Sequence, residues 1–244
     1  MLILALETST RTGGVALLEG LPGGLRIIGE SLLHLPSSHS TRLMPAIDHL
    51  LRQASRSIRE VGGIALALGP GSFTGLRIGV ATAKGLAYAR RIPVAGVPTL
   101  DGLAQNARFA PGLVCPVLDA RKKEVYAALY RGNGEGDLHK EGGDWVLGPE
   151  ELCGRIRERT WFLGDGVEVY GEVFRRQLGS LARFAPAEHS LPRAVHVGCL
   201  SWPRFQAGQV LDLFSFTPTY LRRSEAELLY EKRMAGERPP EEAS

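Results

Sequence analysis

One glycine-rich stretch decides the fold, and it reads Gly69-Pro70-Gly71-Ser72-Phe73-Thr74-Gly75. An apolar run at 64–68 precedes it, and a helical apolar pattern at 76–90 follows it. Glycine permits positive φ angles and close approach of the backbone. A helix that begins here would also present unpaired N–H groups, which favour an anion. The residues alone leave two interpretations open: a phosphate-binding loop and a tight structural turn.

Working outward from this stretch, the same element order occurs in two halves of the chain. The first half predicts three strands, a helix, a strand, the helix after the glycines and a last strand, at 2–6, 14–19, 25–33, 40–54, 64–68, 76–90 and 94–97. The second half predicts strands at 113–118, 124–130, 144–147, 161–163 and 181–184 and helices at 150–159, 167–178 and 193–205.

Three successive strands before an α-β-α-β run are typical of a ribonuclease H-like lobe. We therefore predict an α/β protein with two tandem ribonuclease H-like lobes, in the actin-like or sugar-kinase-like (ASKHA) fold, with a ligand cleft between the lobes. The predicted domains are an N-terminal, partner-binding lobe at 1–104 and a C-terminal lobe at 105–233. The tail at 234–244 is predicted to be disordered, because it is charged and lacks an apolar period.

The glycine stretch matches neither common phosphate-loop motif, because no Lys-Ser or Lys-Thr pair follows it and its third glycine is one residue late for G-x-G-x-x-G. The end of the first strand, 7–10, is a second candidate, since an acidic residue with small hydroxyls there faces the phosphates in actin-like enzymes. As remnants of a phosphate loop, the candidate cofactor-binding residues are Glu7, Thr8, Ser9, Gly69, Gly71, Ser72, Thr74 and Gly75.

Composition and spacing exclude several function classes. The 244 residues carry a net charge of +3, and no apolar run approaches the ~20 residues that a membrane helix needs. The start of the chain lacks a basic leader, so we expect a cytoplasmic protein with no membrane association. Three dispersed cysteines argue against disulfides and a zinc site. The six histidines show no H-x-x-x-H spacing and there is no G-x-S-x-G, so no catalytic or metal-binding residue is predicted.

The helix after the glycine stretch carries small residues on two opposite faces. Gly79, Ala83 and Ala87 recur every four residues, as do 81, 85 and 89. A helix turns by ~100° per residue, so the two sets lie on roughly opposite faces. One face should pack on its own sheet, and the other is open to the preceding helix or to a partner. We predict a partner interface formed by Leu43, Ile47, Leu51, Leu76, Val80, Ala81, Ala83, Lys84, Gly85 and Ala87.

Several motifs resemble those of the bacterial TsaB family, also called YeaZ, from the first strand to about Arg222. They are 6–10, 69–79, 83–87, 97–100, 118–121 and Pro218-Thr219-Tyr220-Leu221-Arg222. The resemblance implies the two-lobed fold and a role in making threonylcarbamoyladenosine (t6A) at position 37 of tRNAs that read codons beginning with A. It implies a non-catalytic subunit that binds the related transferase subunit TsaD, works with the ATPase TsaE, and meets tRNA through that complex. Without TsaD, the same surface would form a homodimer.

Three positions depart from the pattern of the catalytic relative. TsaD-like sequences read E-T-S-C-D-E after the first strand, and Arg11 stands in place of the important Asp. They later read V-x-H-M-E-G-H, and Thr99 and Leu103 replace its two metal-binding histidines. The resemblance thus implies that ATP and metal are used by partner subunits, and that this chain binds no cofactor.

Two other functions compete with this one. A stand-alone ATP-dependent transferase or kinase would suit the fold and the glycine stretch. A metallopeptidase is disfavoured, because the H-x-x-x-H spacing is missing. Basic clusters are mostly solvated surface charge, but some could help to hold tRNA in the complex. The candidates for that contact are Arg121, Lys122, Lys123, Arg222 and Arg223.

Overall fold

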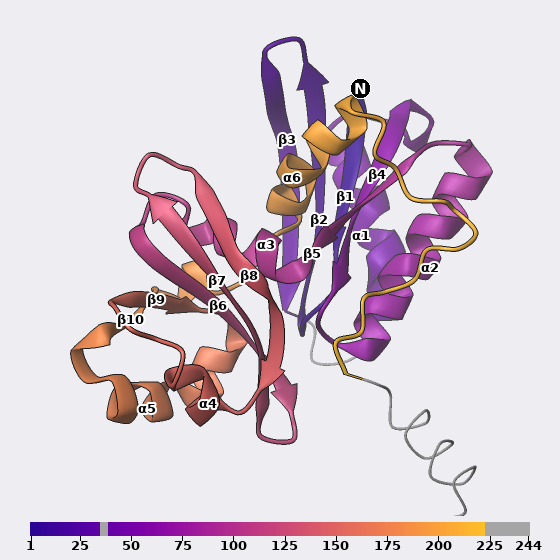
Figure 1. Cartoon of the computed structure of the whole chain (residues 1–244). Coiled ribbons are helices and arrows are strands. Elements are labelled where there is room, and N and C mark those ends of the chain that lie inside the picture. The colour runs from indigo at the N-terminus through magenta and orange to yellow at the C-terminus, as the bar shows by residue number, and fades with distance from the viewer. Residues whose placement is uncertain (35–38, 223–244) are drawn as a thin grey trace, which may run out of the picture.

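A computed structural model describes residues 1–34 and 39–222 and contains two five-stranded sheets (Figure 1). The first sheet has the order β3-β2-β1-β4-β5 and the second has the order β10-β9-β6-β7-β8. The strands of the first are β1 (Leu2–Glu7), β2 (Thr12–Leu21), β3 (Gly24–His34), β4 (Val61–Gly69) and β5 (Val94–Pro98). Those of the second are β6 (Pro111–Arg121), β7 (Glu124–Asn133), β8 (Leu138–Leu147), β9 (Thr160–Leu163) and β10 (Ala182–Phe184).

Each sheet combines an antiparallel trio with two parallel strands in the same arrangement. In the first sheet β1 pairs antiparallel with β2 and parallel with β4, and in the second β6 pairs antiparallel with β7 and parallel with β9. The repeated strand order confirms the prediction of two tandem ribonuclease H-like lobes. Antiparallel neighbours are joined by short hairpins, whereas the parallel pairs need crossover helices.

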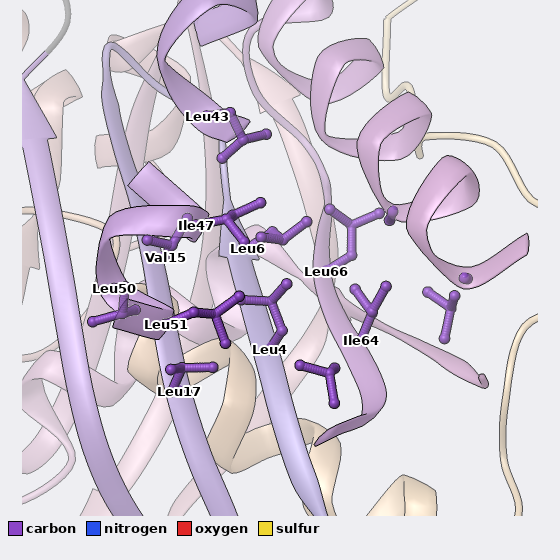
Figure 2. Close-up of a cluster of buried hydrophobic side chains, with 14 of the residues drawn as sticks. Leu4, Leu6, Val15, Leu17, Leu43, Ile47, Leu50, Leu51, Ile64 and Leu66 are labelled. Carbon is purple, nitrogen blue, oxygen red and sulfur yellow. The ribbon is translucent and has the colours of Figure 1, made fainter. Parts of the chain in front are cut away.

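Both faces of the first sheet are covered, which is why β1 is apolar and buried along its whole length. On one face lie α1 (His39–Gln53) and α2 (Phe73–Arg90), which close over Leu4, Leu17 and Leu66. Figure 2 shows this cluster, in which Leu43, Ile47, Leu50 and Leu51 of α1 point at the strands. On the other face lies α6 (Ala194–Gln206).

The position of α6 differs from the sequence prediction, which assigned this helix to the C-terminal lobe. Ala194, Val195 and Val197 pack on Ile3, Ala5 and Ala16 of the first sheet. Arg193 and the Val195 N–H both bind Glu30 of β3. An apolar helical stripe does not specify which of two sheets it will cover. The proposed division at residues 104 and 105 therefore does not describe where α6 lies.

The segment after α6, residues 207–222, also returns to the first lobe, and we call it the strap. It runs alongside α2 (Figure 1). The Leu211 N–H donates to the carbonyl oxygen of Val94 at 2.8 Å, and the Thr219 N–H donates to that of Leu68 at 2.8 Å. The strap was not predicted, because it has no regular period. The tail at 234–244 lies outside the described residues.

The predicted and observed bounds of several helices and strands differ by a few residues. Helix α2 begins at Phe73, three residues earlier than predicted, because Ser72 acts as its N-cap. Helix α4 (Pro149–Cys153) ends at Gly154, its C-cap, so the predicted helix as far as residue 159 is wrong. Strand β8 is longer than predicted, and α5 (Asp165–Leu178) follows β9 as expected.

A short helix, α3 (Thr99–Ala104), joins the two lobes. Its Asp101 accepts a hydrogen bond of 2.6 Å from the Tyr130 hydroxyl and one of 2.7 Å from Lys140, both in the second lobe. Lys140 also lies 2.6 Å from a carboxylate oxygen of Asp144. These contacts fix the lobes on the side of α3.

Candidate functional site

A hollow of about 350 Å³ lies between the two lobes, and we call it the interlobe hollow. The first lobe contributes the β1–β2 turn and the glycine turn, and the second contributes the end of β6 and the start of α5. A second hollow of about 250 Å³ shares several of its walls. The lining residues central to the site are Ser9, Arg11, Gly71, Ser72, Phe73, Asp119, Arg121, Tyr126, Asp165 and Arg222. This is the position at which the fold predicts a ligand cleft.

The glycine turn is packed against the β1–β2 turn, backbone on backbone. A Cβ atom on Gly71 would lie 2.3 Å from the Ser9 carbonyl oxygen, and one on Gly75 would lie 2.0 Å from that of Thr8. A Cβ atom on Gly79 would lie 2.4 Å from the Thr8 hydroxyl. Gly75 and Gly79 are four residues apart in α2, so one face of this helix rests on the β1–β2 turn, and Gly71 packs on it just before the helix begins. Packing within the chain therefore explains why these three positions are glycine.

Three of the eight predicted phosphate-binding residues line the interlobe hollow: Ser9, Gly71 and Ser72. The other five do not line it. The side chains of Glu7 and Thr8 are buried, and among the described residues none forms a hydrogen bond with the Thr8 hydroxyl. Gly69 has a positive φ of 116°, and its missing Cβ would lie 2.5 Å from the Thr219 carbonyl oxygen of the strap.

Gly75 is held under Thr8, and Thr74 is exposed outside the hollow. Most of the predicted loop thus serves the joint between β1, α2 and the strap.

Charges of both signs surround the interlobe hollow. Arg121 pairs with Asp119 at 3.0 Å, and Arg222 donates to Glu124 at 2.9 Å. The Asp119 N–H donates to a carboxylate oxygen of Asp165 at 3.0 Å. Burial raises the pKa of Asp165, and the nearby Asp119 charge adds to this rise. The interlobe hollow therefore presents the carboxylates of Asp119 and Asp165 together with the guanidinium groups of Arg11, Arg121 and Arg222.

The hairpin between β6 and β7 presents the predicted basic cluster. Arg121, Lys122 and Lys123 have φ angles of 61°, 53° and 62°, the left-handed region that residues other than glycine seldom adopt. Only Arg121 of these three lines the interlobe hollow, and Arg222 of the strap lines it from the first-lobe side. The structure thus brings Arg121 and Arg222 to one place. Arg223, the fifth predicted tRNA contact, lies outside the described residues.

Within the described ranges, no group of three or more His, Cys, Asp and Glu side chains is placed to hold a metal ion. Thr99 and Leu103, which the resemblance to TsaD-like sequences sets against two metal-binding histidines, are both fully buried. Leucine offers no donor atom to a metal, and the Thr99 hydroxyl forms no hydrogen bond within the part of the chain that the structure describes. Across 1–34 and 39–222, no helix is both long enough and apolar enough to cross a bilayer.

The predicted partner interface needs a correction, because most of it forms the core of this chain. Seven residues of the set are buried, and they lie in or beside the packing of α1 and α2 on the first sheet. These are Leu43, Ile47, Leu51, Leu76, Val80, Ala83 and Ala87. Their helical spacing marked the buried stripe of each helix, not its outer face.

The outer face of α2 carries the rest. Ala81, Gly85 and Ala89 are exposed, which agrees with the second predicted stripe. The Lys84 ammonium donates to the Phe214 carbonyl oxygen at 3.2 Å, so the strap flanks this face. We call Ala81, Gly85, Tyr88 and Ala89 the outer α2 face.

Sequence reasoning did not find the aromatic residues beside this face. Tyr88 is 68% exposed and lies edge-on to Phe214 of the strap, which is 79% exposed. At the other end of α2, the Phe73 ring lies 5.0 Å from that of Tyr220, whose hydroxyl accepts a hydrogen bond from Arg77. Phe73, Arg77 and Tyr220 lie in motifs quoted from the sequence, whereas Tyr88 and Phe214 lie outside them.

Two tandem ribonuclease H-like lobes with a hollow between them define a protein of the actin-like class. A family model described as TsaD, tRNA N6-adenosine threonylcarbamoyltransferase, matches residues 35–230. A Bacillus subtilis protein named "tRNA threonylcarbamoyladenosine biosynthesis protein TsaB" is 34% identical over 93% of this chain and 96% of its own length. The Escherichia coli protein of the same name is 31% identical over 93% and 96%.

The solved structure of YeaZ from Pseudomonas aeruginosa is also similar, with a TM-score of 0.74 and 31% identity over 90% of this chain and 99% of that one. The chain belongs to the TsaB (YeaZ) family.

Proposed function

We propose that this chain is a non-catalytic subunit required for t6A formation at adenosine 37 of tRNA, and that it acts by binding and supporting a TsaD-type subunit. The names of the TsaB relatives support the pathway. The observation that carries the non-catalytic role is the pair Thr99 and Leu103, buried where the catalytic relatives have metal ligands. Leucine has no donor atom, so no small movement of Leu103 could make it a metal ligand.

The partner surface in this proposal is the outer α2 face, and Gly85 supports it. A Cβ atom built on Gly85 meets no other atom within 4 Å, whereas Gly75 and Gly79 are forced by internal contacts. Glycine inside a helix costs ~0.5–1 kcal/mol relative to alanine. Nothing within the described part of this chain explains that cost at Gly85. A second helix packing closely on the outer α2 face would explain it.

The remaining partners follow from the same assignment. Without TsaD, the outer α2 face would pair with a second copy through an isologous contact. TsaE would join the assembled complex, where ATP and metal are used by the partner subunits. tRNA would be held by the complex, with Arg121, Lys122, Lys123 and Arg222 as contributors from this chain. The protein would act in the cytoplasm.

The surface is tested by measuring binding to a TsaD subunit with Gly85→Glu. Because space at Gly85 is open, the variant should fold with an unchanged melting temperature. We expect its affinity for TsaD to fall at least about a hundredfold, since a charge would be buried in the contact. Val169→Glu on α5 is the matched control, because Val169 is 56% exposed in the other lobe. Full affinity of Gly85→Glu for TsaD would remove the outer α2 face from the proposal.

A further inference from the structure

The strap ends in an ion pair that joins the two lobes. A guanidinium nitrogen of Arg222 lies 2.9 Å from a carboxylate oxygen of Glu124, at the start of β7 in the second lobe. The two side chains are 27% and 37% exposed, so water reaches both partners. Because Arg222 also lines the interlobe hollow, the ion pair lies at the strap side of that hollow.

The strap is anchored to the first lobe immediately before this ion pair. The Thr219 N–H donates to the carbonyl oxygen of Leu68 in β4 at 2.8 Å. The Tyr220 ring lies 5.0 Å from the Phe73 ring, at the start of α2. Arg222 therefore moves with the first lobe, although its ion-pair partner belongs to the second.

The chain itself passes between the lobes in two segments, 99–110 and 185–193. These segments lie together, because the Asn106 side chain of the first donates to the Leu191 carbonyl oxygen of the second at 2.8 Å. The strap begins after α6 on the first lobe and is still bound to that lobe at Tyr220. Both covalent crossings in the described chain thus lie on the α3 side, where α3 is placed between the two sheets (Figure 1).

The α3 side is also held by a larger set of contacts. Leu100 and Leu103 of α3 are fully buried against apolar side chains of the second sheet, and Asp101 accepts a hydrogen bond from that lobe. The donor, Tyr130, lies six residues from Glu124 on β7, about 20 Å along the strand, so the two joints are well separated. Buried leucines contribute more to stability than a partly exposed ion pair, so the strap side is the weaker joint.

We propose that Arg222 and Glu124 form a latch, and that the lobes open about α3 when this latch is released. A partly exposed ion pair is weak and is screened by salt, so the latch leaves a minor population of open chains. Opening would widen the interlobe hollow and separate Arg121 on the second lobe from Arg222 on the strap. The latch thus sets how the β6–β7 hairpin is held relative to the outer α2 face. It is a property of the chain alone and goes beyond the proposed function, so the two can fail independently.

Double electron–electron resonance between two spin labels tests the latch in the full chain. The labels are attached at Thr74→Cys on α2 and Gln177→Cys on α5, which are exposed positions in the two lobes. Cys199→Ser removes the partly exposed native thiol, and Cys115 and Cys153 are buried and need no replacement. The distance distribution then reports closed and open chains as separate populations.

Glu124→Gln keeps the size of the side chain and removes one charge of the latch. We expect the open population to rise about threefold over that of the wild type at about 0.1 M salt, the effect of losing a weak ion pair. In the wild type the open population should also rise as salt is increased to about 1 M, and in Glu124→Gln it should not. Exchanging the two charges, with Glu124→Arg and Arg222→Glu together, should restore the wild-type distances at low salt.

Glu141→Gln is the matched control, because Glu141 is 36% exposed and pairs with Arg131 inside the second lobe. It should leave the interlobe distances unchanged. A second label pair, at Thr74 and Gln53, lies within the first lobe and should give one distance in every variant. The latch is wrong if Glu124→Gln matches the wild type at both salt concentrations, or if the charge exchange leaves the distances as wide as Glu124→Gln does. Equal opening in Glu141→Gln would also overturn it, because any lost ion pair would then loosen the lobes.

Discussion

The backbone N–H of Ser72 donates a hydrogen bond of 2.6 Å to the carbonyl oxygen of Ser9. This bond joins the glycine turn to the β1–β2 turn and fixes where α2 begins. Gly71 and Gly75 make the contact possible, because any side chain there would strike the backbone of Ser9 or Thr8. The glycine turn is therefore a joint between β4 and α2, and its geometry aims the outer α2 face.

Two glycine-to-alanine variants in one helix should act in opposite directions. Gly75→Ala should destabilise the chain by about 1–3 kcal/mol, because its Cβ would lie 2.0 Å from the Thr8 carbonyl oxygen. Gly85→Ala should stabilise it by about 0.5–1 kcal/mol, because the site is open and alanine favours the helix. Denaturant unfolding measures both, and equal signs would contradict the assigned packing.

The second lobe should depend on a stacked phenylalanine pair. The rings of Phe162 and Phe174 lie 4.8 Å apart, and both side chains are fully buried. Phe162→Ala should lower the free energy of unfolding by about 3–5 kcal/mol. Phe109→Ala, at a ring that is 67% exposed, is the control and should cost less than about 1 kcal/mol. A loss of less than about 1 kcal/mol of unfolding free energy for Phe162→Ala would show that the second lobe does not depend on this pair.

Acid should weaken the packing of α6 through His196. Burial, helped by Arg193, lowers the pKa of His196 to about 4, from an ordinary value of 6.5. The unfolded chain thus binds the proton more readily, so stability from His196 is present above pH 6.5 and is lost as the pH falls towards 4. The pKa of Glu7 is raised, so its contribution has the opposite slope between about 4.5 and 7.

Subtracting the profile of His196→Gln from that of the wild type isolates the histidine. The difference in unfolding free energy, measured by denaturant titration from pH 4 to pH 8, should favour the wild type more at high pH. A flat difference would mean that His196 takes up its proton normally in the folded chain.

Reversing the charge of the β6–β7 hairpin should weaken tRNA binding by the assembled complex. Lys122→Glu with Lys123→Glu should raise the Kd and flatten its dependence on salt, because fewer counterions are released. The control reverses Arg175 and Arg176, exposed on α5. Filter binding at several salt concentrations measures both, and an unchanged slope for the hairpin variant would remove the tRNA contact.

The isolated chain should not bind ATP with magnesium. The Ser72 N–H is already bonded to the Ser9 carbonyl oxygen, and Gly71 and Gly75 pack on the backbone of Ser9 and Thr8, so the glycine turn is occupied by its own chain. Calorimetry should therefore detect no binding at millimolar nucleotide. Saturable binding would instead favour the alternative, a stand-alone ATP-dependent transferase or kinase.

Periodicity predicted the two sheets well, because each strand and helix of the duplicated lobe has its own apolar pattern and short turns. The pattern could not place α6, since its stripe fits either sheet, and the contacts of Arg193 and Val195 with Glu30 of β3 come from residues distant in the sequence. The strap has no period at all, so its contact with Lys84 was invisible.

The candidate site was predicted less completely for a related reason. The sequence located Ser9, Gly71 and Ser72 at the interlobe hollow, but it could not separate glycines that admit a ligand from glycines that admit the backbone of the same chain. The small-residue stripes of α2 were found, yet which stripe faces outward depends on the sheet beneath. Gly85 became informative only when the space around it was known.

Reconstitution of t6A formation tests the central claim most directly. Purified TsaD, TsaE, the enzyme that makes threonylcarbamoyl-adenylate, and unmodified tRNA are combined with and without this chain, and t6A per tRNA is measured by mass spectrometry. We predict t6A in the complete mixture, background levels when this chain is omitted, and none when it replaces TsaD. Full modification without this chain, or modification by it in the absence of TsaD, would contradict a required, non-catalytic subunit.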